Sequence, residues 1–271
     1  MIHKFFKFAV TALAASMIFS MNTSAQESKI AIGAHRGFWK TEACKDAQNS
    51  VKALQLAQKY QFWGSECDVQ LTKDNRVVVN HDNDIEGKHI NSTNYADLKD
   101  IRLKNGEKLP TFEQYLKQMA KSKTTKLVLE IKPAENDARS ILLTDLCIQQ
   151  LIEHDLFDPE RVLFISFSIA VCQHVAIVAP QFTNQYLNGQ LSPDDLHAMK
   201  INGLDYHYNV FQKNPQWVSR AHELGMTVNC WTVNNKKDIQ DMIDLNVDCI
   251  TTNEPLLVRK MLGDRENQIE K

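Results

Sequence analysis

The sequence predicts a fold of the α/β class, a (β/α)₈ barrel of the TIM type. Short apolar, strand-like segments alternate eight times with amphipathic, helix-like segments along the chain, which is the pattern of parallel strands joined by helices. A doubly wound sheet is the main competitor, but the turn after the first strand lacks the GxGxxG pattern of that fold. One extra strand-like segment follows the second strand too closely for a helix to intervene, so we expect a β-hairpin there.

The expected strands are Lys29–His35, Trp63–Leu71, Lys126–Lys132, Val162–Phe167, Phe182–Leu187, Gly203–His207, Thr227–Thr232 and Asp248–Thr252. The amphipathic segments between them include Val51–Tyr60, Phe112–Lys121, Ile141–His154, Pro215–Leu224 and Lys237–Leu245. In a barrel of this type the C-terminal ends of the strands gather at one mouth, where the active site lies.

Composition places the chain among globular proteins. It has 271 residues, of which 43% are hydrophobic, enough for a sizeable core. Lys and Arg number 31 against 33 Asp and Glu, a balance that argues against nucleic-acid binding through bulk positive charge. No apolar run reaches the roughly 18 residues of a membrane-spanning helix, so stable membrane insertion is not expected.

The first 25 residues have the order of a secretory signal peptide. Lys4 and Lys7 make the start positively charged, the apolar stretch Phe8–Met21 follows, and small residues precede Gln26. This order is typical of a cleaved signal peptide, with an uncleaved anchor as the alternative. We therefore expect that residues 1–25 are removed and that residues 26–271, the barrel domain, are exported to the periplasm or secreted.

Six cysteines are spread through the mature chain without a CxxC pair: Cys44, Cys67, Cys147, Cys172, Cys230 and Cys249. Their wide, irregular spacing argues against a zinc site. Although disulfides persist in exported proteins, most of these cysteines lie in apolar or strand-like segments. We expect buried small hydrophobic residues rather than a disulfide framework.

The extra strand-like segment Val77–His81 follows the second strand after a short polar stretch that includes Lys73-Asp74-Asn75-Arg76. A helix cannot fit between them, so the segment is expected to fold back antiparallel to the second strand. With Asp74 and Asn75 as the turn, Asp68 is expected opposite His81. The polar stretch Asn83–Leu109 then forms a small insertion before the next helix.

Acidic residues stand at the ends of the expected strands among apolar neighbours. Glu66 and Asp68 share one face of the second strand, because strand side chains alternate, and Glu130 lies near the end of the third. Three carboxylates at one barrel mouth repel one another unless a cation neutralises them. Hard oxygen ligands suit Ca²⁺ or Mg²⁺, so we expect one divalent cation; a structural ion-pair cluster with Arg36 and Lys132 is the alternative.

Two histidines are candidates for proton transfer. His35 ends the first strand, and His81 reaches the same mouth through the hairpin. An ordinary histidine pKa near 6.5 suits an acid/base pair around neutral pH, although the sequence does not tell which one is acid and which is base. Arg36 and Lys132 supply positive charge and N–H donors for an anionic phosphate group.

Aromatic residues near the strand ends are candidates for the walls of a substrate pocket. Phe38, Trp231 and Tyr206 are assigned to this role, together with Trp39 and Tyr208. For Trp231, the sequence is equally consistent with packing inside the barrel.

Eight short motifs, each weak alone, occur in a fixed order along the mature chain: Ala34-His35-Arg36-Gly37, Glu66-Cys67-Asp68-Val69, Val78-Val79-Asn80-His81-Asp82, Leu109-Pro110-Thr111-Phe112-Glu113, Leu129-Glu130-Ile131-Lys132, Ser166-Phe167, Cys230-Trp231-Thr232-Val233-Asn234 and Thr252-Asn253-Glu254-Pro255. Together they resemble the glycerophosphodiester phosphodiesterase family, within the phospholipase C-like phosphodiesterase superfamily. The resemblance implies a barrel with a small insertion after the second strand. It also implies a calcium or magnesium ion held by the three carboxylates, catalysis by the two histidines, and phosphate binding by Arg36 and Lys132.

The activity implied by this resemblance is metal-dependent hydrolysis of a glycerophosphodiester to sn-glycerol 3-phosphate and an alcohol, through a cyclic phosphate. Two alternatives stay open: a phosphodiesterase acting on lysophospholipids or inositol lipids, and a non-catalytic exported protein that binds phosphate compounds. The mature chain has no basic amphipathic helix for a membrane surface, which favours small, water-soluble diesters. The chain departs from the family at Gln48, where a glutamate is usual, and this departure bears on charge balance at the site.

Overall fold

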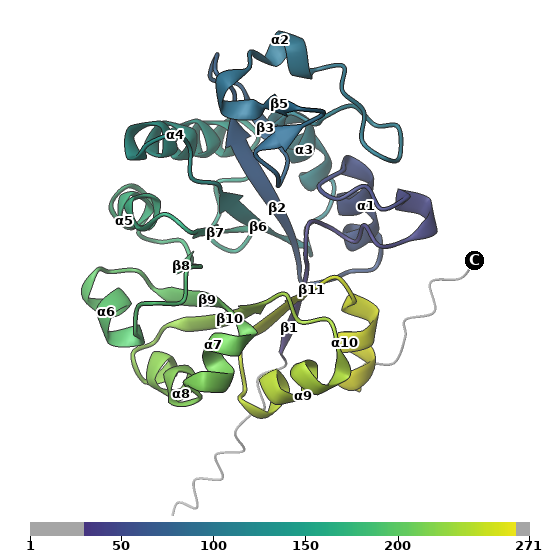
Figure 1. Cartoon of the computed structure of the whole chain (residues 1–271). Helices are drawn as coiled ribbons and strands as arrows, with labels where there is room; N and C mark the ends of the chain where they lie inside the picture. Colours follow the sequence, from purple (N-terminus) through teal and green to yellow (C-terminus); the bar gives the residue numbers. More distant parts are fainter. Residues whose placement is uncertain (1–29, 264–271) are drawn as a thin grey trace, which may run out of the picture.

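Eight parallel strands close into a barrel within residues 30–263, the part of the chain that this computed structural model describes. The strands follow the order β1-β11-β10-β9-β8-β7-β6-β2, and pairing of β1 with β2 closes the ring. Helices surround the strands on the outside (Figure 1). The predicted barrel is therefore confirmed, and each of its eight predicted strands overlaps a strand of the structure.

The strands are β1 Ala31–Ala34, β2 Gly64–Leu71, β3 Val77–Val79, β4 Asp84–Ile85, β5 Lys88–His89, β6 Lys126–Ile131, β7 Val162–Ser166, β8 Asn184–Tyr186, β9 Gly203–His207, β10 Thr227–Trp231 and β11 Cys249–Thr252. The α-helices are α1 Val51–Lys59, α2 Tyr95–Leu98, α3 Phe112–Met119, α4 Asp137–Glu153, α5 Ile169–Val178, α6 Pro193–Ala198, α7 Tyr208–Lys213, α8 Gln216–Glu223, α9 Lys236–Asp244 and α10 Pro255–Met261. Two short 3₁₀-helices span Glu42–Cys44 and Ile90–Ser92.

Polar caps determine where several helices begin. At the start of α1, the hydroxyl of Ser50 accepts a hydrogen bond from the backbone N–H of Ala53. Helix α4 begins at Asp137, earlier than the predicted Ile141, because the side chain of Asn136 caps its first turn. The apolar periodicity used for the prediction does not extend into this polar turn.

Alternation along the strands divides the core. Side chains on the outer face of the barrel pack beneath the helices in two large hydrophobic clusters. A smaller cluster of Val128, Leu163, Ile165 and Leu187 fills part of the barrel interior. All six cysteines are buried free thiols, which confirms the prediction that they act as small hydrophobic residues.

The hairpin forms as predicted, but its register is shifted by one residue. Asp68 lies opposite Asn80, whose backbone N–H donates to the Asp68 carbonyl at 3.0 Å, and not opposite His81. The physical reason is the turn, which contains the three residues 73–75 instead of two. Asn75 adopts a left-handed φ of 64°, as the last residue of a three-residue hairpin loop often does.

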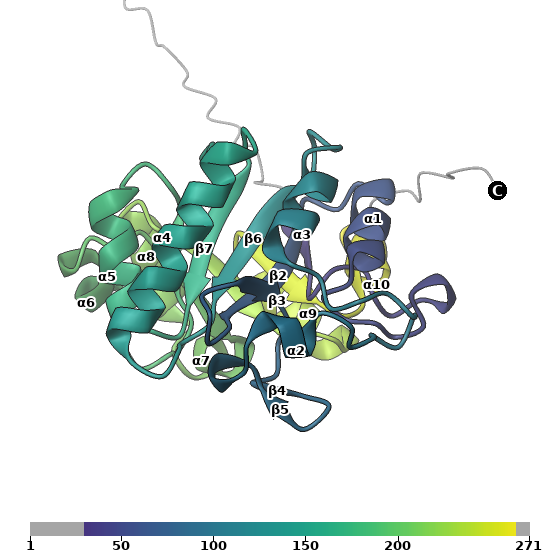
Figure 2. The ribbon, with the colours of Figure 1, turned by 90° about the horizontal axis from the view of Figure 1, so that it is seen from above.

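Residues 83–109 form the expected insertion, which holds the β4–β5 hairpin and α2. It projects from the barrel beside β3 (Figure 2). It packs through a small cluster of its own, made of Val78, Ile90, Leu98, Ile101 and Leu109. The segment with His81 connects β3 to this insertion.

The predicted signal peptide, residues 1–25, lies outside the described residues. Within residues 30–263, no helix combines the length and the apolar character that crossing a bilayer requires.

Candidate active site

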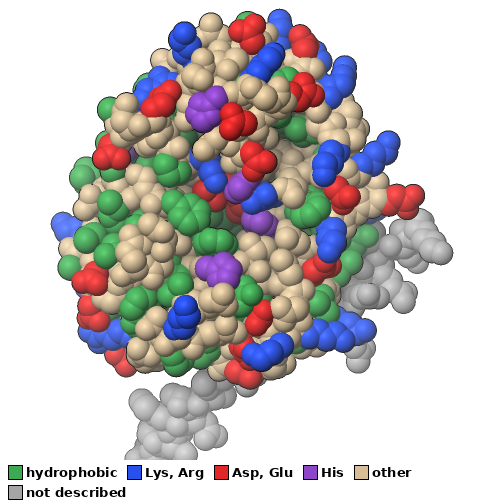
Figure 3. All heavy atoms as spheres, in the orientation of Figure 1, with side chains coloured by type: hydrophobic (Ala, Val, Ile, Leu, Met, Phe, Trp, Pro, Cys, Tyr) green, Lys and Arg blue, Asp and Glu red, His purple; other side chains and the backbone are tan. Residues whose placement is uncertain are grey.

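A cavity of about 440 Å³ opens at the C-terminal mouth of the barrel. The space-filling view shows a central hollow where histidine, basic and acidic side chains gather beside hydrophobic ones (Figure 3). The cavity is lined by His35, Arg36, Glu66, His81, Glu130, Ile165, Phe167, Leu187, Asp205, Trp231, Thr232 and Thr251. It therefore has an ionic side, built around β1, β2 and β6, and a largely apolar side, built from β7 to β10.

Glu66, Asp68 and Glu130 come together on the ionic side, as side-chain alternation predicted. One ligand oxygen from each lies within 4.8 Å of the other two, and all three residues are buried. Glu66 Oε1 has no hydrogen-bond partner, and Asp68 Oδ1 and Glu130 Oε1 are approached only by the ammonium group of Lys132. Buried carboxylate oxygens with so few donors fit a hard divalent cation, so the triad can hold a metal ion.

Crowding of the three carboxyl groups shifts their pKa values. Burial, followed by the charges of Asp68 and Glu130, raises the pKa of Glu66 well above its ordinary range. Burial and then the charge of Asp68 raise the pKa of Glu130 to about 8. For Asp68, burial is outweighed by Lys132, His81 and a hydrogen bond from Asn49, so its pKa is lowered. Without a cation, the triad therefore retains protons near neutral pH, and metal binding would release them.

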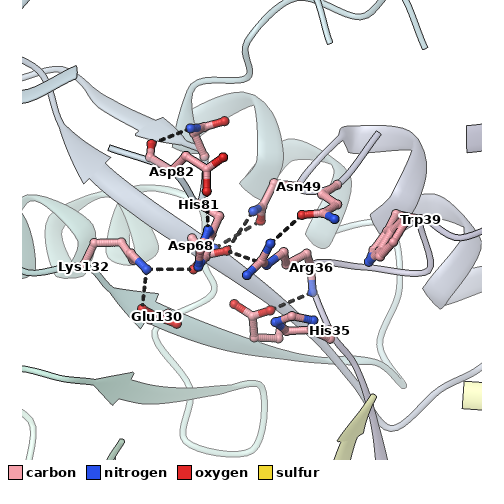
Figure 4. A network of polar contacts seen from close by, with 12 residues as sticks. His35, Arg36, Trp39, Asn49, Asp68, His81, Asp82, Glu130 and Lys132 are labelled. Atoms are coloured by element: carbon pink, nitrogen blue, oxygen red, sulfur yellow. Dashed lines mark hydrogen bonds and ion pairs between the residues drawn. The ribbon is translucent and has the colours of Figure 1, made fainter. Parts of the chain in front are cut away.

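Two cationic side chains border the triad (Figure 4). Lys132 Nζ lies 3.0 Å from Glu130 Oε1 and 3.6 Å from Asp68 Oδ1. Arg36 Nε lies 3.8 Å from Asp68 Oδ2. The ion-pair cluster considered from the sequence thus exists, but neither cation forms an ion pair with Glu66, whose Oε1 is left without a hydrogen-bond partner. The cluster and a metal site are compatible.

The backbone at Arg36 adopts a left-handed conformation with φ of 55°, which is uncommon for a residue other than glycine. In this conformation its N–H donates to Glu66 Oε2 at 2.6 Å. Gly37 follows with φ of 78°, and a Cβ there would lie 2.7 Å from the Cβ of Ala53, so only glycine fits. The turn therefore depends on this dipeptide and couples the phosphate-binding candidate to the acidic triad.

Gln48 holds the guanidinium of Arg36 without neutralising it. Its Oε1 accepts a hydrogen bond from Arg36 Nη1 at 2.5 Å. An amide orients the guanidinium as a carboxylate would, but it carries no charge. Gln48 therefore leaves more positive charge on Arg36 available to an anionic ligand than a carboxylate at this position would.

His35 is fixed in one tautomer by its neighbours. Its Nδ1 lies 2.8 Å from Asn253 Oδ1, which also accepts a hydrogen bond from Trp39 Nε1 at 3.3 Å. Because that oxygen only accepts, Nδ1 carries the proton and Nε2 is left with a free lone pair. Burial, followed by the charge of Arg36, lowers the pKa of His35 to about 4. His35 is therefore neutral near pH 7 and suited to accept a proton.

His81 has a more open environment, with 35% of its side chain exposed. Its Nδ1 lies 2.7 Å from Asp82 Oδ1. The loop is held by Gln70, whose Nε2 donates to the carbonyl oxygens of Asn80 at 2.8 Å, His81 at 3.2 Å and Asp82 at 2.7 Å. The two histidines therefore differ in exposure and in the partner of Nδ1, an amide oxygen for His35 and a carboxylate for His81.

Of the predicted pocket residues, Trp231 lines the cavity. Its Nε1 donates to the Asp205 carbonyl at 2.8 Å, and its ring meets Phe167 edge to face with centroids 5.6 Å apart. Trp231 therefore both lines the cavity and packs within the barrel. Trp39 does not line the cavity; its indole N–H donates to Asn253 Oδ1, the atom that also contacts His35.

The structure corrects the assignment of Phe38 and Tyr206. Phe38 is buried against Tyr60 and Phe62 on the outer side of the barrel, with ring centroids 5.1 and 5.2 Å away. Tyr206 is fully buried and donates to the Leu191 carbonyl at 2.8 Å. Neither side chain reaches the cavity, because Phe38 follows the left-handed turn and Tyr206 occupies an outward position of β9.

Sequence reasoning missed three residues of the site: Asp205, Asn253 and Gln70. Asp205 lines the cavity, and burial raises its pKa to about 8. The signal was present, since Asp205 is an ionisable residue in an apolar strand, as Glu130 is. Asn253 and Gln70 act through hydrogen bonds to His35 and to the His81 loop, and no pattern in the sequence marks such contacts.

Comparison with known proteins agrees with this geometry. The model of the glycerophosphoryl diester phosphodiesterase family matches residues 35–257. A glycerophosphodiester phosphodiesterase of Caldanaerobacter subterraneus is 27% identical over 246 residues, covering 84% of this chain and 95% of that protein. These matches span almost the whole described barrel.

Solved structures give the same picture. The crystal structure of a glycerophosphodiester phosphodiesterase from Parabacteroides distasonis is 45% identical, with a TM-score of 0.85, covering 88% of this chain and 99% of that one. A phosphodiesterase of Oleispira antarctica, solved with the product sn-glycerol-3-phosphate, shares the fold at 23% identity, with a TM-score of 0.73 and coverage of 87% and 97%. The chain belongs to the glycerophosphoryl diester phosphodiesterase family, a family of phosphoric diester hydrolases.

Proposed function

We propose that this protein hydrolyses glycerophosphodiesters to sn-glycerol 3-phosphate and an alcohol. The observation that carries the proposal is the joint presence, around one cavity, of a buried acidic triad and two imidazoles in contrasting environments. A protein that only captures phosphate compounds has no use for a proton acceptor and a proton donor on the same cavity. The names of the curated relatives and the product bound to the Oleispira enzyme support the same reaction.

Glu66, Asp68 and Glu130 would hold one divalent cation, Ca²⁺ or Mg²⁺, because all three offer hard carboxylate oxygens. When bound, this ion supplies charge neutralisation for a phosphate oxygen and acidifies a hydroxyl beside it. Arg36 and Lys132 complete the phosphate site with N–H donors. Gln48 keeps the guanidinium of Arg36 in place without competing for its charge.

His35 takes the proton of the glycerol 2-hydroxyl at Nε2, and that oxygen attacks phosphorus. The bond from phosphorus to the headgroup oxygen breaks, and His81 gives its proton to the leaving alcohol. The product of this step is a cyclic phosphate of glycerol. Water then opens the ring: His81 accepts a proton from the water, and His35 returns its proton to the 2-hydroxyl, which restores both side chains.

The proposed location is outside the cytoplasm, because the sequence before Gln26 has the order of a signal peptide. Substrates would then be diesters that reach the periplasm or the medium. Water-soluble glycerophosphodiesters fit this location and the small cavity.

The decisive experiment measures glycerol 3-phosphate release from glycerophosphocholine, glycerophosphoethanolamine, glycerophosphoinositol and a lysophospholipid, with and without EDTA. We expect EDTA-sensitive turnover of the soluble diesters and a loss of about 10²- to 10⁴-fold in His35→Ala and His81→Ala. His197→Ala removes an exposed imidazole from α6 and serves as the matched control. Substrate binding without turnover under any divalent metal would favour the binding-protein alternative, and preferential cleavage of the lysophospholipid would favour the lipid alternative.

A further inference from the structure

Asp205 is a buried acid that the proposed reaction does not use. It lies in β9, on the opposite side of the barrel from β2, and is 1% exposed. Its Oδ1 has no hydrogen-bond partner, although the residue lines the cavity. Burial alone raises its pKa to about 8, since no cationic side chain offsets the loss of water. The carboxyl group is therefore mainly neutral near pH 7.

A second unpartnered polar atom lines the same cavity. Thr251, in β11, is buried, and its Oγ1 has no hydrogen-bond partner. Buried polar atoms are nearly always satisfied in proteins, and exceptions often mark a ligand site. The lining of the same cavity also has an apolar part, which includes Ile165, Leu187 and Trp231.

The chemistry of this wall selects among possible ligand groups. A neutral carboxyl donates one hydrogen bond and accepts others, and so does a threonine hydroxyl. A ligand hydroxyl satisfies both, whereas a quaternary ammonium group offers no donor and a phosphate would meet no positive charge there. The apolar wall suits the C–H surface of a short polyol.

The cavity also indicates which end of a diester lies inward. A wide, open hollow of about 1050 Å³ adjoins it, and His81 and Phe167 line both. His81 is the proposed proton donor to the leaving alcohol. The headgroup therefore extends outward past His81, and the glycerol end lies in the enclosed cavity, facing β9 and β11.

We infer that Asp205, assisted by Thr251, binds the free terminal hydroxyl of the glycerol moiety and so selects diesters in which that hydroxyl carries no acyl chain. This inference rests on the proposed function and names a specificity-determining residue for it. An acyl ester at that position removes the O–H donor and forces a chain against a buried polar pair. Lysophospholipids acylated there are then poor substrates for a structural reason.

The test pairs two substrates with three proteins. The substrates are glycerophosphocholine and its analogue built on propane-1,2-diol, which lacks the terminal hydroxyl and keeps the attacking one. The proteins are the unmodified enzyme, Asp205→Leu and Asp205→Asn, all with the same divalent metal. We expect the unmodified enzyme to prefer glycerophosphocholine by at least about 10²-fold in kcat/KM. Asp205→Leu should lose this preference, and Asp205→Asn should keep most of it, because an amide also donates and accepts.

Folding does not confound this test. Asp205→Leu replaces an unpartnered buried acid with an apolar side chain, so its melting temperature should not fall, and any general effect on turnover is divided out because the readout is the ratio of kcat/KM for the two substrates within each protein. A merely structural role would lower turnover of both substrates alike. Only recognition of the hydroxyl makes the loss depend on the substrate.

Two outcomes would overturn the inference alone: equal turnover of both substrates by the unmodified enzyme, or a preference that persists in Asp205→Leu. A third such outcome is that Asp205→Leu loses the preference only for substrates with a charged headgroup. This is tested by repeating both substrates with ethanol in place of choline. If the unmodified enzyme turns over neither substrate with any divalent metal, the proposed function itself fails, and the inference fails with it.

Discussion

Asn253 accepts a hydrogen bond from Nδ1 of His35 at 2.8 Å and thereby leaves Nε2 free to take a proton. The two residues are 218 positions apart in the chain. They meet because β11 and β1 are neighbours in the ring, with Ala34 beside Thr252. Closure of the barrel thus sets the proton-accepting state of the imidazole.

Replacing Asn253 by aspartate should move the pH dependence of turnover. A carboxylate beside His35 favours the imidazolium and raises the His35 pKa from its low value near 4. Since the base must be neutral, activity would then be lost at a higher pH as the solution is acidified. The measurement is kcat/KM against pH, with Asn246→Asp, an exposed change of the same kind, as control. An acidic limb that does not move would contradict the assigned hydrogen bond.

Removal of metal should make stability depend on pH in a defined window. The folded-state pKa of Glu130 is about 8 against an ordinary 4.5, so the native state binds more protons than the unfolded state between these values. The free energy of unfolding of the metal-free protein therefore falls as pH rises through this range. His35, with its lowered pKa, acts in the opposite sense, but only between about 4 and 6.5.

Between about pH 6.5 and pH 8, the titration of His35 therefore does not oppose the effect of Glu130 on stability. Thermal unfolding of EDTA-treated protein should show a lower melting temperature at the upper end than at the lower end. Added Ca²⁺ or Mg²⁺ should raise the melting temperature, and more so at the upper end. Glu130→Gln should lose part of the pH dependence, and Glu66 and Asp205, whose pKa values are also raised, retain the rest. A melting temperature indifferent to both pH and metal would refute the metal assignment of the triad.

Introducing a negative charge beside Arg36, with Gln48→Glu, should weaken substrate binding. A glutamate would neutralise the Arg36 guanidinium that Gln48 now only orients. We expect KM to rise about tenfold, which corresponds to roughly 1.4 kcal/mol, with kcat changed less. Gln48→Met, which removes the hydrogen bond without adding charge, separates orientation from neutralisation. An unchanged KM in Gln48→Glu would mean that Arg36 does not contact the phosphate.

The mature protein should begin at Gln26. Production of the full chain in a bacterial host, followed by N-terminal sequencing and intact-mass measurement of the exported fraction, checks this expectation. Protein recovered from the cell envelope with residues 1–25 still attached would support the uncleaved anchor instead. A variant with Lys4 and Lys7 replaced by glutamate should be exported poorly.

The barrel and the acidic triad were predictable because both rest on periodicity. Eight apolar segments alternating with helices specify the ring, and alternation within β2 places Glu66 and Asp68 on one face. The same rule, applied to β9, assigns Asp205 inward and Tyr206 outward. Tyr206 was misassigned because proximity to a strand end was used in place of the side-chain direction.

Other features depend on local geometry that a sequence does not reveal. The hairpin register turned on whether the loop had two or three residues, which the left-handed φ of Asn75 decides. Phe38 points away from the cavity because the chain reverses at Arg36 and Gly37. The contacts of Asn253 and Gln70 join segments distant in the chain or loops of irregular shape, and no short-range pattern predicts them.

Because of the insertion of residues 83–109, the two histidines of the site stand on parts of the structure that are stabilised separately. His35 stands on the ring itself, while His81 stands on a segment steadied by Gln70 and by the small cluster around Ile90 and Leu98. Since the proposed reaction uses both imidazoles, local unfolding of this insertion would abolish activity while the barrel stayed intact. On heating, activity should accordingly be lost at a lower temperature than the barrel fold. Substitutions in residues 83–109 could therefore change the catalytic rate while the barrel keeps its structure.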